Sequence, residues 1–260
     1  MKIEHISTSN WENAFRGMRN PYDSWSKSDS KFGLGYIGAQ REKMSKEYPH
    51  LTFNDWCIKQ DGELCEYAAI GKEDIKLAKS LIKGGPVHSK FLRQIFISMD
   101  ITAPLFVWKE LDTYKVGTAA NSCSTMHTIQ KHPIDLGCFE IGDFNKEIAG
   151  GEFIESSLIP YLEHLRTKYN DLNKLSWDTE NPEIADGYRK EAMKYWKELI
   201  RWLPESWLQT RTWTANYEIA RNILRWRDPH KLTEWEPICQ ALKDLPYGKD
   251  FLSFDDKSTN

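Results

Sequence analysis

The sequence predicts a single α+β domain, over residues 1–260, in which helix predominates. Short strand-like segments precede longer segments of helical periodicity, and the C-terminal half is helical in pattern. No internal repeat and no low-complexity linker divides the chain. A length of 260 residues and a hydrophobic share of 40% suffice for a sizeable buried core.

The N-terminal third is expected to begin with a strand over Lys2–Ile6, followed by a helix that starts at Trp11. Three residues can each cap this helix: Thr8, Ser9 and Asn10. Residues 19–50 are polar and rich in Gly, Ser and Lys, which predicts a loop. Gly71–Ile82 has one apolar face and is therefore a predicted helix, which Gly84-Gly85-Pro86 ends.

The rest of the chain begins with a predicted strand over Phe91–Ile101, where apolar and β-branched residues alternate. A helical run over Leu105–Tyr114 follows, and residues 128–155 look irregular. Pro182 suits the first turn of a long helix. Four helices are predicted in this half: Leu158–Tyr169, Pro182–Leu203, Trp213–Arg227 and Leu232–Leu245.

Charge and hydropathy exclude two classes of partner. A net charge of −3 disfavours sequence-independent nucleic-acid binding, although a small phosphorylated ligand needs only a few local cations. No apolar run reaches the roughly 18–20 residues that span a bilayer, and the N-terminus lacks an apolar signal region. We therefore expect a cytoplasmic protein that binds neither nucleic acid nor membrane.

Cysteine and tryptophan are the informative minor residues. The cysteines are odd in number, contain no Cys-x-x-Cys pair, and are interpreted as reduced thiols without a metal: Cys57, Cys65, Cys123, Cys138 and Cys239. The eleven tryptophans suit interfaces and planar ligands as well as a core, because indole combines an apolar face with an N–H donor.

Four places carry candidate functional residues. His88 lies where a loop enters the Phe91–Ile101 strand, a common place for a site, and is otherwise an exposed loop histidine. Asn121-Ser122-Cys123-Ser124 lies in a small polar run that is also typical of ordinary turns, and Cys123 is a weak candidate nucleophile. Arg201 ends a helix and is there explained by the helix dipole alone.

The fourth place is the segment from Trp213 to Arg227. Asn216 and Arg227 are eleven residues apart, about three helical turns, and are expected near one face, with Asn222 off that line. Carboxamides and a guanidinium can bind the edge of a planar base or an anion. The alternative is a solvated face on which the arginines are surface charges.

Taken in order, these residues resemble the flavin-dependent thymidylate synthases, the ThyX family. That family carries a histidine before a strand, then A-P-x-F-V-x-x-Q, then the hallmark R-H-R-x-x-S, then N-E-x-S-x-R-Y. His88 precedes the strand at the matching distance, and residues 103–107 fall on A-P-x-F-V. Residues 113–118 occupy the hallmark and, with one inserted residue, 121–127 fall on N-E-x-S-x-R-Y.

The C-terminal half resembles the family independently. Leu203-Pro204 falls on L-P and Trp213–Asn216 on W-T-x-N, while Asn222 and Arg227 fall on a flavin-contacting Asn and the nucleotide-binding Arg. The resemblance covers about Ile75–Ile238 in two blocks, 75–127 and 201–238 being the strongest. It implies a ThyX-like fold, in which helices flank a central antiparallel sheet and the C-terminal half is helical.

The hallmark itself departs from the family pattern. Thr113, Tyr114 and Lys115 stand for R-H-R, so a charge remains but the guanidinium fork is lost. Glu110 stands for the expected Gln, and Met126 for an Arg that helps to bind the nucleotide.

The resemblance implies one-carbon transfer to carbon 5 of a pyrimidine deoxynucleotide, dUMP or related, by a homotetramer with FAD as cofactor. Methylenetetrahydrofolate and NADPH are the implied co-substrates, and Arg227 with Ser124 the implied catalytic residues. The implied FAD-binding residues are His88, Lys115, Thr118, Asn216 and Asn222. The implied substrate-binding residues are Glu110, Asn121, Ser122, Ser124, Arg201 and Arg227.

Two other functions remain open at this point. A binding protein on the same fold would hold a nucleotide or flavin without the reaction, and a helical interaction protein would share only ancestry with the family. The loss of the hallmark arginines is what keeps these alternatives open.

Overall fold

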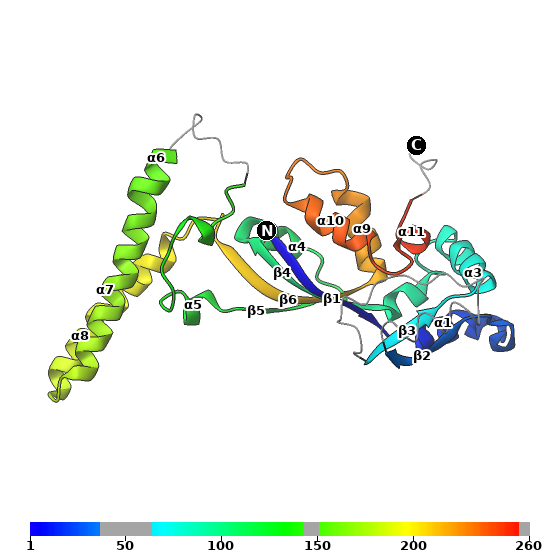
Figure 1. Cartoon of the computed structure of the whole chain (residues 1–260), viewed down its shortest axis with the longest axis horizontal. Helices are drawn as coiled ribbons and strands as arrows, with labels where there is room; N and C mark the ends of the chain where they lie inside the picture. The colour runs from blue at the N-terminus through cyan, green and yellow to red at the C-terminus, as the bar shows by residue number, and fades with distance from the viewer. Residues whose placement is uncertain (37–63, 143–150, 255–260) are drawn as a thin grey trace. The chain divides into compact units, whose positions relative to one another are not determined.

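The computed structural model describes residues 1–36, 64–142 and 151–254, and the chain divides into two compact units (Figure 1). Unit 1 comprises Met1, Thr102–Leu111 and Ser122–Arg211, and unit 2 comprises Lys2–Ile101, Asp112–Asn121 and Thr212–Asn260.

The main sheet has four antiparallel strands in the order β1-β4-β6-β5, which confirms the predicted α+β class with an antiparallel sheet (Figure 1). Its strands are β1 (Lys2–Ser9), β4 (Phe96–Pro104), β5 (Ala119–Ser122) and β6 (Leu208–Asn216). In β4 the alternate residues Ile97, Met99, Ile101 and Ala103 are buried, as expected for a strand with one face on a core. The predicted strand therefore exists but begins later, because Lys90–Gln94 forms a 3₁₀ turn, η3.

A second, two-stranded sheet corrects the loop that was predicted over residues 19–50. Lys31–Tyr36 is a strand, β2, and pairs antiparallel with β3 (Leu64–Ala69), with Lys31 opposite Ala69. Gly33 and Gly35 weaken the strand pattern, and the partner strand is distant in sequence. Short 3₁₀ turns, η1 (Asn20–Tyr22) and η2 (Trp25–Lys27), precede β2, and the rest of the predicted loop, 37–50, lies outside the described residues.

The helices of unit 2 enclose an aromatic core. They are α1 (Trp11–Arg19), α3 (Lys72–Lys83), α9 (Tyr217–Arg227), α10 (Trp235–Lys243) and α11 (Gly248–Phe251). The fully buried Trp11 ring contacts Tyr217 edge-on at 5.2 Å between centroids and Tyr247 at 5.7 Å. The Tyr247 hydroxyl accepts a hydrogen bond from Ile70 N at 2.8 Å and donates to Ala68 O at 3.0 Å, so it ties β3 to this core.

At the start of α1, the predicted capping residues do not make the expected capping hydrogen bonds. Asn10 is the N-cap residue, but its backbone is left-handed (φ 67°) and its side chain makes no capping hydrogen bond. Its amide donates instead to Gln94 O at 2.8 Å, while the Thr8 hydroxyl accepts from Trp11 Nε1 at 3.1 Å. Of the predicted caps, Asn10 thus serves a tertiary contact and Thr8 a local side-chain contact.

The predicted helix over Trp213–Arg227 begins four residues late. Trp213 to Asn216 belong to β6, and α9 starts at Tyr217 with Asn216 as its N-cap. In β6, Thr212 and Thr214 are exposed while Trp213 and Ala215 are buried, an alternation with the period of a strand.

Unit 1 is dominated by the hairpin of α7 (Ile159–Asp178) and α8 (Pro182–Arg201) (Figure 1). The Asn181 side chain caps α8 by accepting from Glu183 N at 2.9 Å and Ile184 N at 3.3 Å, and Pro182 occupies the first turn as predicted. The shorter elements are α4 (Leu105–Leu111), α5 (Thr125–Thr128), η4 (Leu136–Cys138), α6 (Gly151–Phe153) and the π-helical η5 (Ile154–Leu158).

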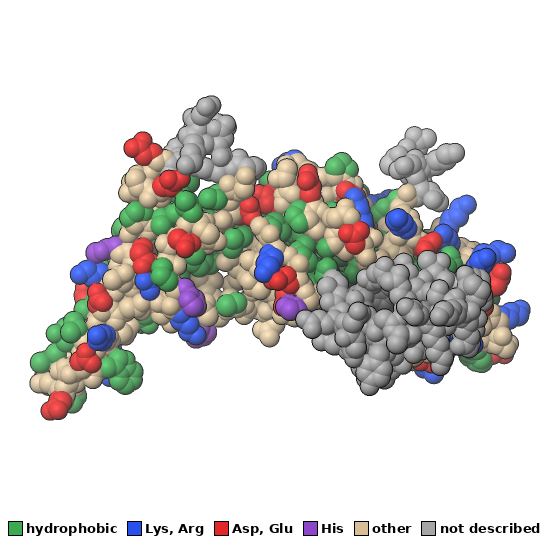
Figure 2. All heavy atoms as spheres, in the orientation of Figure 1, with side chains coloured by type: hydrophobic (Ala, Val, Ile, Leu, Met, Phe, Trp, Pro, Cys, Tyr) green, Lys and Arg blue, Asp and Glu red, His purple; other side chains and the backbone are tan. Residues whose placement is uncertain are grey.

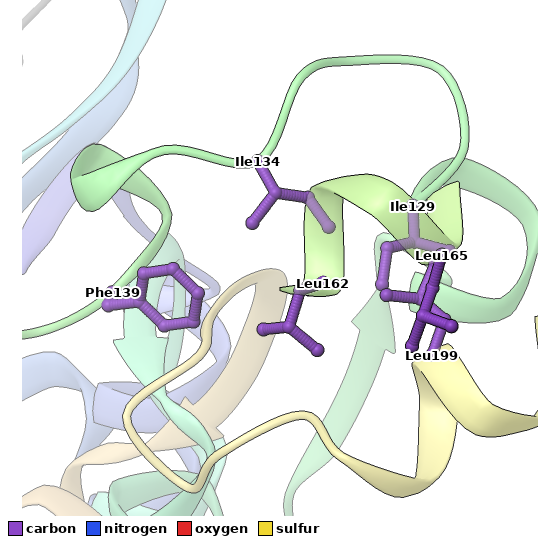
Figure 3. Close-up of a cluster of buried hydrophobic side chains, with 6 residues drawn as sticks. All are labelled: Ile129, Ile134, Phe139, Leu162, Leu165 and Leu199. Carbon is purple, nitrogen blue, oxygen red and sulfur yellow. The ribbon is translucent and has the colours of Figure 1, made fainter. Parts of the chain in front are cut away.

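The core of unit 1 joins the hairpin to the segment before it. Figure 3 shows its six buried side chains, which come from the 129–139 segment and from both long helices. They are Ile129, Ile134, Phe139, Leu162, Leu165 and Leu199.

No helix in the described part of the chain is long and apolar enough to cross a membrane. On the face that Figure 2 shows, acidic, basic and hydrophobic side chains are interspersed.

Candidate functional site

Unit 2 contains a cavity of about 660 Å³ whose wall is built from four segments. Gly85, Pro86 and Ser89 come from the turn after α3, and Val116 and Gly117 from the segment before β5. The third segment is α9, preceded by its cap residue, and the fourth is Phe254 after α11; Ile82, Leu92 and Arg93, on either side of the turn after α3, complete the wall. The cavity thus unites three of the sequence blocks that carry candidate residues.

One face of α9 lines this cavity with polar side chains, which are Glu218, Arg221, Asn222 and Arg225. Their spacing of three or four residues places them on one side of a helix, while Ala220, Ile223 and Leu224 are buried on the other. The sequence interpretation paired Asn216 with Arg227 and set Asn222 apart. The structure instead places Asn216 and Asn222 in the same wall, because Asn216 precedes the helix rather than lying within it.

Asn216 has a structural task as well as a place in the wall. Its side-chain oxygen accepts from Ile219 N at 3.0 Å, which caps α9, and the residue is only 8% exposed. Its Nδ2 faces Gly117, where a Cβ atom would approach it to 2.9 Å. Since Gly117 has φ +80°, both the backbone and the close approach favour glycine there.

An ion pair within the cavity wall was missed by sequence reasoning. Arg93 makes two hydrogen bonds to the Glu218 carboxylate, that from Nη2 measuring 3.0 Å, and these bonds raise the pKa of Arg93. The partners are 125 residues apart, so no local pattern signals the pair. Both were inconspicuous charged residues in the sequence, although the spacing of Glu218, Arg221 and Arg225 could have indicated a shared helix face.

Arg227 lies at the end of α9, in a setting of aromatic rings. Its guanidinium carbon lies 4.8 Å from the centroid of the Trp235 ring and 5.9 Å from that of Tyr114. Its Nε donates to the Tyr114 hydroxyl at 3.2 Å, and Nη1 lies 3.0 Å from His230 Nε2. The residue at the family histidine position therefore contacts the expected nucleotide-binding arginine.

The other predicted flavin-binding residues surround the same turns of unit 2. His88 is exposed in the turn that contributes Gly85 and Pro86 to the cavity. Lys115 is exposed beside Val116, and the Thr118 hydroxyl donates to Tyr114 O at 2.6 Å, which closes the turn around Gly117. Asn121, a predicted substrate residue, is exposed on β5.

The remaining predicted substrate residues belong to unit 1, so the structure does not bring them together with unit 2 residues in one compact unit. Glu110 is half-buried on α4, and Ser122 ends β5. Ser124 precedes α5, where its carbonyl accepts from the Thr128 hydroxyl at 2.8 Å. Arg201 is exposed and forms an ion pair with Glu198, one turn earlier on α8.

No cysteine in the described part of the chain lines this cavity, and Cys57 lies outside that part. The thiol of Cys239 is buried, and burial raises its pKa to about 11; burial likewise raises the pKa of Cys138. Among the described residues no group of three His, Cys, Asp or Glu side chains could hold a metal ion.

Comparison with known proteins shows the fold. The chain is similar to the flavin-dependent thymidylate synthase ThyX from Helicobacter pylori, in a crystal structure complexed with FAD and dUMP. The two share 16% sequence identity with a TM-score of 0.56, over 97% of each chain. A second structure of Helicobacter pylori ThyX with FAD and dUMP gives 16% identity and a TM-score of 0.55 over 97% of each chain. No family model and no curated protein sequence matches the chain. The ThyX-like fold that the sequence predicts is thereby confirmed.

Proposed function

We propose that this chain is a divergent flavin-dependent enzyme that transfers a one-carbon unit to carbon 5 of a pyrimidine deoxynucleotide, dUMP or related. The supporting observation is the unit 2 cavity, where the turn next to His88, the hallmark segment at Gly117, the α9 cap residue Asn216 and Asn222 of α9 meet. The similar Helicobacter pylori structures contain FAD and dUMP, which favours the same ligand classes here.

The residues of the cavity suit FAD. Arg221 and Arg225 can neutralise a diphosphate, and the Asn222 carboxamide can bond the edge of a planar ring. Apolar walls for a ring system come from Leu92, Val116 and other residues, and 660 Å³ is typical of a small-molecule site. FAD supplies hydride transfer when bound, and NADPH and methylenetetrahydrofolate are the proposed co-substrates.

The protein's own share in this proposal is to bind and polarise the pyrimidine. Arg227 is held in a fixed direction by the Trp235 ring and the Tyr114 hydroxyl, so its guanidinium is oriented before the ligand arrives. Such a group stabilises negative charge that develops on the ring. Ser124, Asn121 and Glu110 are the proposed contacts to the rest of the nucleotide.

The second candidate function is a flavin- or nucleotide-binding protein that lacks the reaction. Two contacts favour it. The Tyr114 hydroxyl accepts a hydrogen bond from the Arg227 guanidinium. Glu218, paired with Arg93, places a carboxylate in the wall of a cavity that is proposed for an anionic cofactor. A retained cofactor without turnover is the expected behaviour in that case.

Titration of FAD against the apo protein, followed by flavin fluorescence, tests both candidates. We expect saturable binding in the high micromolar range, weaker than with the full hallmark, because Lys115 is the only cation left within it. Asn222→Ala should weaken binding, whereas Asn173→Ala, a carboxamide of unit 1 outside the cavity, should not. Absence of saturable FAD binding would eliminate the enzyme, and FAD binding without nucleotide methylation would favour the binding protein.

A homotetramer is part of the proposal, because the resemblance implies a site built from several subunits. Sedimentation equilibrium of the purified chain should give four times the 30.4 kDa of the monomer. A monomer at every concentration would contradict the shared site and the roles proposed for the unit 1 residues.

A further inference from the structure

A second cavity of about 830 Å³ adjoins the first in unit 2. The two share part of their lining, including Arg221, Arg225 and Phe254. The rest of the second cavity is formed by Leu224 of α9 and by residues of α10, α11 and the segments next to them, none of which lines the first cavity. Figure 1 shows α9, α10 and α11 following one another along the chain, in orange and red.

The lining of the second cavity carries an excess of positive charge. Its cations are Arg221, Arg225, Lys243 and Lys249, and its acids are Asp228 and Asp244, which leaves a net charge of +2. This is opposite in sign to the chain as a whole, whose net charge is −3. In Figure 2 several Lys and Arg side chains lie around the region where Figure 1 places α11 and α3.

The acids cancel only part of this charge. Lys243 Nζ lies 2.5 Å from Asp228 Oδ2, and Asp244 accepts a hydrogen bond from the neutral Gln240 at 2.9 Å. Within the part of the chain that the structure describes, the Lys249 ammonium makes no ion pair, and the residue is exposed. A flexible, unpaired ammonium at the rim can reach an anion at little cost.

The cavity is also lined by apolar side chains, and this apolar surface favours some anions over others. Ile82, Leu224, Leu252 and Phe254 contribute apolar surface, and the Arg221 guanidinium lies 4.1 Å above the Phe254 ring. Several cations favour an anion with more than one charge, and the adjacent apolar wall favours a ring attached to it.

We propose that this second cavity is a binding site for a nucleoside diphosphate, with its phosphates on Lys243 and Lys249 and its ring against the apolar wall at Leu224 and Leu252, none of which lines the first cavity. The site does not depend on the function proposed for the first cavity, because Lys243, Lys249 and Asp244 line only the second. It would therefore persist in a chain without the flavin reaction.

Calorimetric titration of the full chain with ADP tests the site. Lys249→Glu turns an attraction into a repulsion and should weaken ADP binding about tenfold, since exposed charge pairs contribute modestly. Asp244→Asn removes a carboxylate and keeps the acceptor for Gln240, so binding should tighten a few-fold. The matched control Lys76→Glu, an exposed residue of α3 outside both cavities, changes the net charge equally and should have no effect.

Two further measurements separate this site from the first cavity. Asn222→Ala alters only the first cavity, so it should leave ADP binding unchanged while it weakens FAD binding. Pyrophosphate should bind more weakly than ADP and respond to the same lysine substitution. The proposal is overturned if ADP does not bind at millimolar concentration, if Lys249→Glu and Lys76→Glu behave alike, if Asn222→Ala abolishes ADP binding, or if pyrophosphate binds as tightly as ADP.

Discussion

Replacing Gly117 by alanine should destabilise unit 2 and weaken cofactor binding together. At φ +80° a non-glycine residue costs about 1–2 kcal/mol, and the new Cβ would lie 2.9 Å from Asn216 Nδ2. If Asn216 moves, its cap on α9 is lost, which costs a further ~1 kcal/mol. The expected loss of stability is therefore about 1–3 kcal/mol.

Thermal unfolding followed by circular dichroism measures this loss. For a chain of this size each kcal/mol lowers Tm by about 2–4 °C, so Gly117→Ala should lower it by roughly 2–12 °C. Gly187→Ala is the matched control, because a Cβ there meets nothing within 4 Å and the residue lies inside α8. Alanine is the better helix former, so this control should stabilise the chain by up to ~1 kcal/mol.

A double-mutant cycle with Asn216→Ala tests the physical cause. If Gly117→Ala acts partly by displacing the Asn216 cap, the double variant should lose less than the sum of the single losses. A Gly117→Ala protein that unfolds at the same temperature as its parent would refute the predicted destabilisation. If the losses of the two single variants add exactly in the double variant, Gly117→Ala does not act by displacing the Asn216 cap.

Three other predictions concern ligand binding, pH and the core. Arg227→Ala should abolish calorimetric binding of dUMP, whereas Met126→Arg should tighten it by about ten- to a hundred-and-fifty-fold, the worth of one charge-assisted hydrogen bond of ~1.5–3 kcal/mol. Glu163→Gln should destabilise the chain at neutral pH, because the Arg166 hydrogen bond lowers the pKa of Glu163 below its ordinary 4.5. That contribution is present above the unfolded-state pKa and is lost as the pH falls through the lowered folded-state pKa. Urea denaturation should therefore show the two proteins converging as the pH falls below 4.5. Tyr247→Phe should cost about 1–3 kcal/mol in the same assay, because it leaves a buried backbone N–H without its acceptor.

Each of these has an opposing outcome. Unchanged dUMP binding in Arg227→Ala would show that the residue correspondence with the family is wrong, whatever the fold. A Glu163→Gln deficit that stays constant from pH 7 to pH 3 would show that the loss is steric rather than electrostatic. A Tyr247→Phe protein as stable as its parent would mean that Ile70 N finds another acceptor.

Local signals in the sequence predicted the helices with well-marked ends. Asn181-Pro182 places a cap and a first-turn proline together, and Gly84-Gly85 ends α3, with Gly85 at φ +90°. The β6–α9 boundary was missed although Thr212-Trp213-Thr214 alternates in burial, because the apolar content of this run is low. The edge strand β5 shows no alternation of buried and exposed residues, since all four of its residues are exposed.

The site was harder to predict than the fold, because its geometry joins residues that no periodicity relates. The blocks around His88, Gly117 and Asn222 were found through a resemblance, whereas the Arg93–Glu218 pair follows only from the tertiary structure. Helical spacing also failed for Asn216, since the residue lies before the helix to which it was assigned.

The residues that this chain shares with the family pattern are not equally informative about function. Gly117 and Asn216 both stabilise the fold, because one has a positive φ beside a close neighbour and the other caps α9. Their presence would be expected in an active enzyme and in an inactive relative alike. Lys115 and Asn222 are exposed, and within the described residues their side chains make no hydrogen bond or ion pair. The fold therefore does not explain why Lys115 and Asn222 are present. Measuring ligand binding by variants at these two positions tests whether the site is functional, whereas the presence of the motif alone does not.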